Sequence, residues 1–278
     1  MRCGGMVAVL ALAVAACGSQ PTQTQPSATA GAQGDAVTQA SSDAPPAPPT
    51  PDPAAKGRDD KVENDLYSFG YSYPGAASAI DPLRALLDKR LADAKADLIS
   101  SARSGKADAD KDGFPYHAYT RQIDWKVVTD LPGWLSLSAD YYEYSGGAHG
   151  MSGFDTLLWD RGAQVARKPI DLFASAEALR GAIRTLFCDA LDVQRAQKRG
   201  EPVQRDGGEM FSECIDPAAQ TLILGSSNRK TFDRIGLLVA PYEAGPYAEG
   251  SYEVTVPVTA KVMAVLKPQY RSAFSVKP

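Results

Sequence analysis

Residues 67–100 read YSFGYSYPGAASAIDPLRALLDKRLADAKADLIS and contain the two patterns that decide the fold. Over 67–73 aromatic residues occupy every second position, which is the period of a half-buried strand. Asp81-Pro82 then matches an N-cap followed by proline at the first helical position, and leucines follow at helical spacing. This pattern predicts one long amphipathic helix that ends before Gly105. A strand followed by a helix therefore opens the folded region.

The rest of the chain repeats this order of strands and a helix. Three further strands are predicted at 119–129, 135–144 and 154–159. The second half then contains a strand and loop at 165–173, a helix that Ser175 caps, strands at 221–224, 234–240 and 251–257, and a short helix at 259–266. We therefore expect an α+β fold of two consecutive units, residues 61–162 and 163–278, each with antiparallel strands packed against one long amphipathic helix.

The first sixteen residues have the features of a signal peptide. Arg2 provides a positive charge, and the apolar run at 6–16 would span only about 16 Å as a helix, which is too short to cross a bilayer. The small residues before Cys17 resemble the bacterial lipobox, which implies that the Cys17 thiol carries diacylglycerol and becomes the N-terminus. Gly18 stands where retention in the inner membrane would need aspartate, which implies attachment at the periplasmic face of the outer membrane. The alternative is an ordinary secretory signal with a chance cysteine at this position.

Residues 17–60 should form a lipidated, disordered tether. They are mostly alanine, proline, threonine, glutamine, serine and glycine, and such a segment cannot bury enough apolar surface to offset the entropy of ordering it. The proline-rich part at 45–53 favours stiff polyproline II. We interpret it as a spacer between the membrane and the folded region, although the same proline spacing also suits an SH3-like partner.

Two of the four cysteines remain for the folded region, because Cys3 leaves with the signal peptide and Cys17 is lipidated. An exported protein matures in an oxidising space, so we expect Cys188 and Cys214 to form a disulfide. Two buried free thiols are the alternative. The formal net charge of −4 makes nucleic acid a poor candidate partner, whereas a basic protein would suit it.

The sequence contains few residues suited to catalysis. Its only histidines are His117 and His149, and it has no HExxH, GxSxG, Walker or dinucleotide-binding motif. Residues 108–113 match the first half of an EF-hand loop, but the twelfth position is Tyr119 rather than glutamate, and Pro115 lies inside the loop. We therefore predict a solvated acidic turn there, and expect no metal, no cofactor and no enzymatic activity.

Two stretches rich in tyrosine, glycine and proline are the candidate binding surfaces. Residues 141–150 read YYEYSGGAHG, and residues 240–250 read APYEAGPYAEG. Glycine and proline shape the backbone of such loops, while tyrosines offer large, rigid contact surfaces. The alternative is a turn and a crossover whose side chains only pack on the sheet. The predicted binding residues are Tyr142, Tyr144, Gly146, Gly147, His149, Tyr242, Glu243 and Tyr247. We expect the two stretches to lie near one another on the same face and to form one recognition surface.

These two stretches, in this order, resemble the paired extracytoplasmic domains of unknown function in RsiV-like proteins, and the resemblance covers residues 61–278. It implies an α+β module, found on an anti-sigma factor that binds lysozyme and also fused to PdaC-type peptidoglycan deacetylases. The sequence does not match the sigma-binding segment and transmembrane helix of that anti-sigma factor. It also does not match the deacetylase domain with its metal-binding histidines. We therefore expect the extracytoplasmic module alone, on a lipid tether.

Together these patterns predict a lipid-anchored cell-envelope protein whose folded region binds c-type lysozyme or a peptidoglycan-related ligand. The alternative is an enzyme that acts on cell-wall glycan through carboxylates such as Glu143 and Glu249. Glycoside hydrolysis needs two carboxylates about 5–9 Å apart, and sequence does not reveal that separation. Two facing carboxylates in one cleft would favour the enzyme, whereas exposed tyrosines on a ridge of loops would favour the binding protein.

Overall fold

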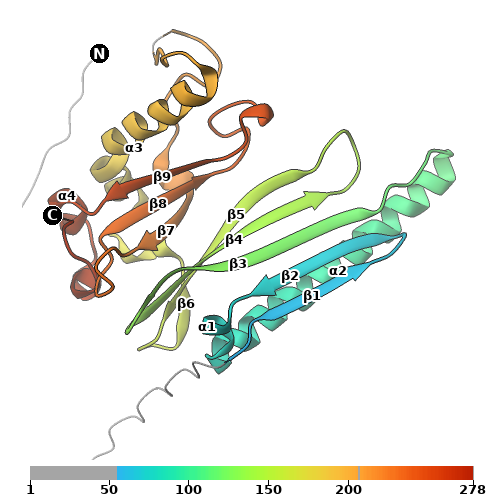
Figure 1. Cartoon of the computed structure of the whole chain (residues 1–278), viewed down its shortest axis with the longest axis horizontal. Coiled ribbons are helices and arrows are strands. Elements are labelled where there is room, and N and C mark those ends of the chain that lie inside the picture. The colour runs from blue at the N-terminus through green and yellow to red at the C-terminus, as the bar shows by residue number, and fades with distance from the viewer. Residues whose placement is uncertain (1–54, 206, 278) are drawn as a thin grey trace, which may run out of the picture. The chain divides into compact units, whose positions relative to one another are not determined.

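A computed structural model of the chain describes residues 55–205 and 207–277 (Figure 1). The predicted signal peptide, Cys17 and the predicted tether up to residue 54 lie outside the described residues. In the described ranges, no helix is both long enough and apolar enough to cross a membrane.

The N-terminal unit is built on a six-stranded sheet whose strands follow one another in sequence order. These strands are β1 (Arg58–Glu63), β2 (Tyr67–Tyr73), β3 (Tyr119–Leu131), β4 (Trp134–Tyr144), β5 (Met151–Asp160) and β6 (Val165–Arg167). All neighbouring strands are antiparallel except β2 and β3, which are parallel. The parallel pair arises because the helices α1 (Gly75–Ser78) and α2 (Asp81–Asp112) carry the chain back to the starting end of β2.

The long helix α2 covers one face of this sheet, running along β1 and β2 (Figure 1). Its leucines recur at helical spacing and are buried together with alternate residues of the strands. This core contains Leu83, Leu87, Leu91 and Leu98 from α2, with Phe69, Tyr71, Trp125, Leu135, Leu137, Leu157 and Trp159 from the sheet. The alternating aromatic residues of β2 and the helix-spaced leucines of α2 therefore pack in one hydrophobic core.

Helix α2 differs from its prediction at both ends. It begins at Asp81 itself, so that Ile80 rather than Asp81 is the N-cap. It also continues through Gly105, because this glycine is a packing position rather than a stop: a Cβ atom there would overlap the phenol of Tyr119. The helix ends at Gly113, whose φ of 76° is the left-handed conformation that glycine adopts readily.

The predicted acidic turn is therefore wrong, because residues 108–112 form the last turn of α2. On a helix Asp108 and Asp112 share one face, but Asp110 points to the opposite side, so the three carboxylates do not converge as EF-hand ligands do. Asp110 instead pairs with Lys106 one turn earlier, at 2.8 Å. In the parts of the chain that the structure describes, no three His, Cys, Asp or Glu side chains are grouped to hold a metal ion.

The C-terminal unit is a three-stranded antiparallel sheet with one long helix beside it (Figure 1). Its elements are the strands β7 (Thr221–Gly225), β8 (Arg234–Val239) and β9 (Tyr252–Pro257), the α-helices α3 (Ala176–Arg199) and α4 (Ala260–Ala264), and the 3-10 helices η1 (Pro169–Leu172), η2 (Pro217–Ala219), η3 (Tyr247–Glu249) and η4 (Pro268–Ala273). Ser175 caps α3, since its hydroxyl accepts from the Ala178 amide at 3.0 Å. Leu179, Ile183, Phe187 and Leu191 of α3 lie in the core with the inner residues of β8 and β9.

The predicted α+β fold of two units, each pairing a sheet with a long helix, is confirmed. Two edges differ from the predicted boundaries. Strand β1 begins at Arg58, within the predicted tether, and β6 adds to the N-terminal sheet although it follows residue 162. In the second unit, Cys188 on α3 and Cys214 form a disulfide with their Cα atoms 5.5 Å apart, which ties the segment before β7 to the helix.

Candidate functional site

The two tyrosine-rich stretches meet in space, although 93 positions separate His149 from Tyr242. His149, on the loop between β4 and β5, stacks on Tyr247 of the loop between β8 and β9, with ring centroids 4.1 Å apart. Tyr242 lies beside both rings, with centroids 6.3 Å from His149 and 5.5 Å from Tyr247. We call His149, Tyr242 and Tyr247 the aromatic triad.

Hydrogen bonds connect the triad to the carbonyl of Gly150. Tyr247 Oη donates to this oxygen at 3.0 Å, and His149 Nδ1 lies 2.9 Å from it. With the proton on Nδ1, His149 donates to the same carbonyl, and Nε2 is then left to accept from Tyr242 Oη at 3.4 Å. Since a carbonyl oxygen has two lone pairs, it satisfies both donors, and the three rings form one connected group.

Tyr242 is displayed on the surface in an unusual backbone conformation. Its side chain is 46% exposed, and its φ of 72° is one that bulky residues rarely adopt. Such strain persists only where surrounding structure imposes it, and it occurs often at binding sites. Tyr247 is half-buried and Glu243 is exposed. The loop therefore presents one exposed ring against a partly buried one.

The last two turns of α3 bind the loop between β8 and β9, which we call the triad loop, through three basic side chains. Arg195 Nε donates to the Ala244 carbonyl at 2.9 Å, and Arg199 Nη2 donates to the same oxygen at 3.2 Å. Lys198 Nζ donates to the carbonyls of Glu249 and Ser251, each at 2.6 Å. These three carbonyls lie between Tyr242 and the start of β9, so α3 holds the backbone of the triad loop on the C-terminal side of Tyr242.

Sequence reasoning missed these cations because basic residues in a last helical turn are usually explained by the helix dipole. One signal was present. Arg195 follows Leu191 by four residues and so falls on the apolar stripe of α3, where a charge needs buried partners. Arg195 is fully buried, and this desolvation lowers the pKa of its guanidinium despite an ion pair with Asp192 at 3.2 Å.

The other predicted binding residues of the first stretch divide between two places. Tyr142 packs against Gly150, where a Cβ atom would overlap its ring, and so lies next to the triad. Tyr144 turns to its own loop, donating from Oη to the Gly147 carbonyl at 3.2 Å. Gly146 and Gly147 have φ values of 99° and 89°, which explains why both are glycine. Tyr144 and these glycines line a separate pocket near the end of α2.

The two carboxylates that a glycan-acting enzyme would need are both engaged in ion pairs. Glu143 pairs with Arg121 at 2.9 Å, and Glu249 pairs with Arg199 at 2.9 Å and accepts from Tyr252 Oη. Burial alone would raise the pKa of Glu249, but hydrogen bonds from Arg199 and Tyr252 outweigh it and hold the pKa below its ordinary value. A general acid needs a raised pKa, so Glu249 is poorly suited to donate a proton.

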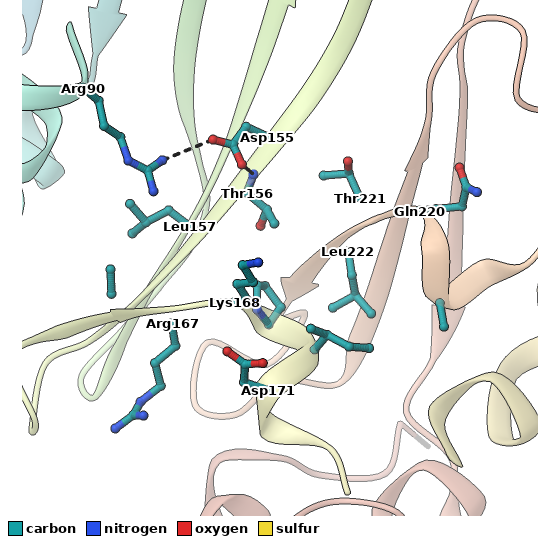
Figure 2. Close-up of a pocket in the computed structure, with 14 residues that line it drawn as sticks. Arg90, Asp155, Thr156, Leu157, Arg167, Lys168, Asp171, Gln220, Thr221 and Leu222 are labelled. Atoms are coloured by element: carbon teal, nitrogen blue, oxygen red, sulfur yellow. Dashed lines mark hydrogen bonds and ion pairs between the residues drawn. The ribbon is translucent and has the colours of Figure 1, made fainter. Parts of the chain in front are cut away.

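A second pocket, of about 510 Å³, lies between β5, the segment after β6, and β7 (Figure 2). Arg90 pairs with Asp155 at 3.1 Å on one side of it, and Lys168 and Asp171 line the other. The same ion pair borders an adjoining pocket of about 290 Å³ whose rings are Tyr71, Trp125, Tyr141 and Phe154. Sequence reasoning missed both pockets because their residues are scattered along the chain and form no local motif.

Comparison with known proteins finds one family model that matches the N-terminal unit and solved structures of low sequence identity. The family model for the deacetylase PdaC matches residues 60–152, which include the first tyrosine-rich stretch and end before the second. A solved DUF3298-family structure from Bacteroides fragilis NCTC 9343 is 18% identical and covers 78% of this chain and 95% of that chain, with a TM-score of 0.49. Another, from Pseudomonas aeruginosa PAO1, is 16% identical and covers 80% of this chain and 98% of that chain, with a TM-score of 0.42. Comparison with curated protein sequences finds no match.

Proposed function

We propose that this chain is a binding protein of the bacterial cell envelope, anchored by lipid on Cys17, whose aromatic triad recognises a protein partner, with c-type lysozyme as the leading candidate. The observation that carries the proposal is the assembly of two distant loops into one exposed aromatic group. The match to the PdaC family supports a role related to the cell wall. The resemblance of both loops to those of RsiV-like proteins supports lysozyme as the partner.

The physical properties of the triad suit recognition of a protein. Tyrosine rings bury large areas but lose few rotatable bonds on contact, and a loop already held by α3 loses little more entropy on binding. The formal charge of −4 favours the approach of a basic partner through long-range attraction. The rigid rings thus favour high affinity for the partner, and the net charge favours fast association with it.

A glycan-acting enzyme is the competing proposal, and the same geometry weighs against it. Its two candidate carboxylates, Glu143 and Glu249, are each paired with an arginine. Their ion pairs give both residues a structural role, whereas the triad has exposed surface with no such role. We therefore favour binding over catalysis.

The proposal is tested by calorimetric titration of c-type lysozyme into the full chain carrying Cys17→Ala. Tyr242→Ala and Tyr247→Ala should each weaken binding by about 1–2 kcal/mol, roughly 5- to 30-fold. Val193→Ala, which truncates a side chain 58% exposed on α3, is the matched control and should bind as tightly as the parent. Thermal unfolding of each variant separates lost contact from lost fold. Failure of the parent protein to bind lysozyme, or undiminished affinity in both tyrosine variants, would refute the proposal.

A further inference from the structure

A pocket at the C-terminal end of α2 gathers four aromatic side chains, three from residues 114–119 and one from residue 144. Its volume is about 500 Å³, within the range of about 300–1,000 Å³ that is common for ligand sites. We call it the distal pocket. Its lining consists of Phe114, Tyr116, Tyr119 and Tyr144 with Gly105, Asp108, Pro115, His117, Ser145, Gly146 and Gly147.

Three of the rings are held in place by contacts that do not need a ligand. Tyr116 and Tyr119 stack with centroids 5.6 Å apart, and Tyr116 Oη donates to the Leu66 carbonyl at 2.8 Å. Tyr119 lies against Gly105, where no larger residue fits. Tyr144 is tied through its hydroxyl to the Gly147 carbonyl. The pocket therefore has a preformed aromatic wall.

The fourth ring, Phe114, is 54% exposed. It directly follows the helix end at Gly113, and its amide donates to the Ala109 carbonyl at 3.1 Å, so its backbone is fixed by the helix terminus. An exposed phenylalanine in a fixed position beside a pocket contributes little to the fold. It is well placed to cover a ligand.

The polar groups of the distal pocket define the ligand it would take. Apart from the tyrosines, the polar side chains of the lining are Asp108, His117 and Ser145, which are exposed to solvent and bond to none of the described residues, so a ligand can reach them. No lysine or arginine lines the pocket, in contrast to the pocket in Figure 2. An anionic ligand is thus disfavoured. A ligand with flat C–H faces and many hydroxyls satisfies both the rings and the polar groups.

We propose that the distal pocket is a saccharide site, in which a pyranose ring packs on Phe114 and Tyr119 while its hydroxyls bond to Asp108, His117 and Ser145. The inference rests on the proposed envelope function in one respect, the choice of an amino-sugar glycan as the ligand. It adds to that function a second site, separate from the aromatic triad, through which the protein contacts cell-wall glycan.

The test titrates the N-acetylglucosamine tetramer into the full chain carrying Cys17→Ala and measures the heat of binding by calorimetry. Phe114→Ala should weaken binding at least tenfold, and because Phe114 is exposed, the variant should keep the parent's melting temperature. Asp108→Asn and His117→Ala should each weaken binding by a smaller factor. Val193→Ala again serves as the control for truncating an exposed apolar side chain.

The inference is overturned if the parent protein does not bind the tetramer at millimolar concentration, or if Phe114→Ala binds as well as the parent. Titration with lysozyme in separate experiments keeps the two proposals apart. Binding of the tetramer without binding of lysozyme would refute only the partner proposed for the triad. Binding of lysozyme that Phe114→Ala leaves intact, with no binding of the tetramer, would refute only the saccharide site.

Discussion

Arg195 Nε donates to the carbonyl oxygen of Ala244 at 2.9 Å, and the side chain that makes this bond is fully buried. The same guanidinium donates from Nη1 to the Glu213 carbonyl at 3.0 Å, next to Cys214. One side chain therefore links α3, the disulfide-bonded segment and the triad loop. A buried charge is therefore bonded to the backbone of the loop that carries Tyr242 and Tyr247.

Replacing Arg195 by methionine should lower the free energy of unfolding by about 2–4 kcal/mol, because several carbonyls and Asp192 lose a buried partner. Arg184→Met, at an exposed position of the same helix, should cost less than about 1 kcal/mol. Urea unfolding measures both. Equal losses in the two variants would show that Arg195 does not hold the loop.

Tyr242→Gly should separate stability from binding. Glycine adopts a φ of 72° without strain, so the variant should unfold at the same temperature as the parent or at a slightly higher one. Its affinity for the partner should nevertheless fall, since the exposed ring is lost. Thermal unfolding and calorimetric titration of the same sample measure the two effects. A lower melting temperature would mean that the ring supports the fold.

The double change Cys188→Ser and Cys214→Ser should lower the free energy of unfolding by about 3–4 kcal/mol in the chain-entropy description, since the bond closes a loop of 26 residues. Peptide mapping of envelope-derived protein without reductant should recover the linked pair. Recovery of both residues as free thiols would contradict the prediction.

Glu249→Gln should make stability less dependent on pH in acid. The folded pKa of Glu249 lies below its ordinary value of 4.5, so its ionised form stabilises the fold above that pH. This contribution is lost as the pH falls through the lowered folded pKa. The parent protein should therefore lose more stability than the variant between about pH 5 and pH 3, although the variant is less stable at neutral pH. Parallel pH profiles of the two proteins would exclude the linkage.

Cys17→Ala should release the protein from membranes without lowering its melting temperature, because the sequence predicts that Cys17 belongs to the disordered tether and makes no contact with the folded core. The lipid attached to such a cysteine supplies several acyl chains, enough for stable anchoring. Fractionation in the native host compares the variant with the parent. A variant that still requires detergent for extraction would contradict the lipoprotein assignment.

Much of the fold follows from local pattern. The alternation over 67–73 and the leucine spacing after Pro82 identify β2 and α2 because side-chain period reports which face is buried. The cap at Ser175 locates the start of α3 for the same kind of local reason. The end of α2 was misjudged because Gly105 has a role that only its contact with Tyr119 explains.

The candidate site was found only in part from the sequence. Composition singled out the two glycine- and proline-rich stretches with their tyrosines and predicted that they lie near one another on one face, which the contacts of His149 with Tyr242 and Tyr247 confirm. It did not predict which rings stack. Their stacking depends on where the sheets place the two loops. The pockets beside Arg90 and Phe114 likewise combine residues that are far apart in the chain.

By itself, then, the sequence determined most of the elements, the cap of α3, the fold class and the pairing of Cys188 with Cys214. The tertiary structure alone decided that α3 holds the triad loop and that His149 meets Tyr247. The physical reason is that Arg195, Lys198 and Arg199 bond to backbone carbonyls. Every residue carries a carbonyl, so the sequence of the loop contains no sign of which oxygens these side chains will reach until the chain is folded.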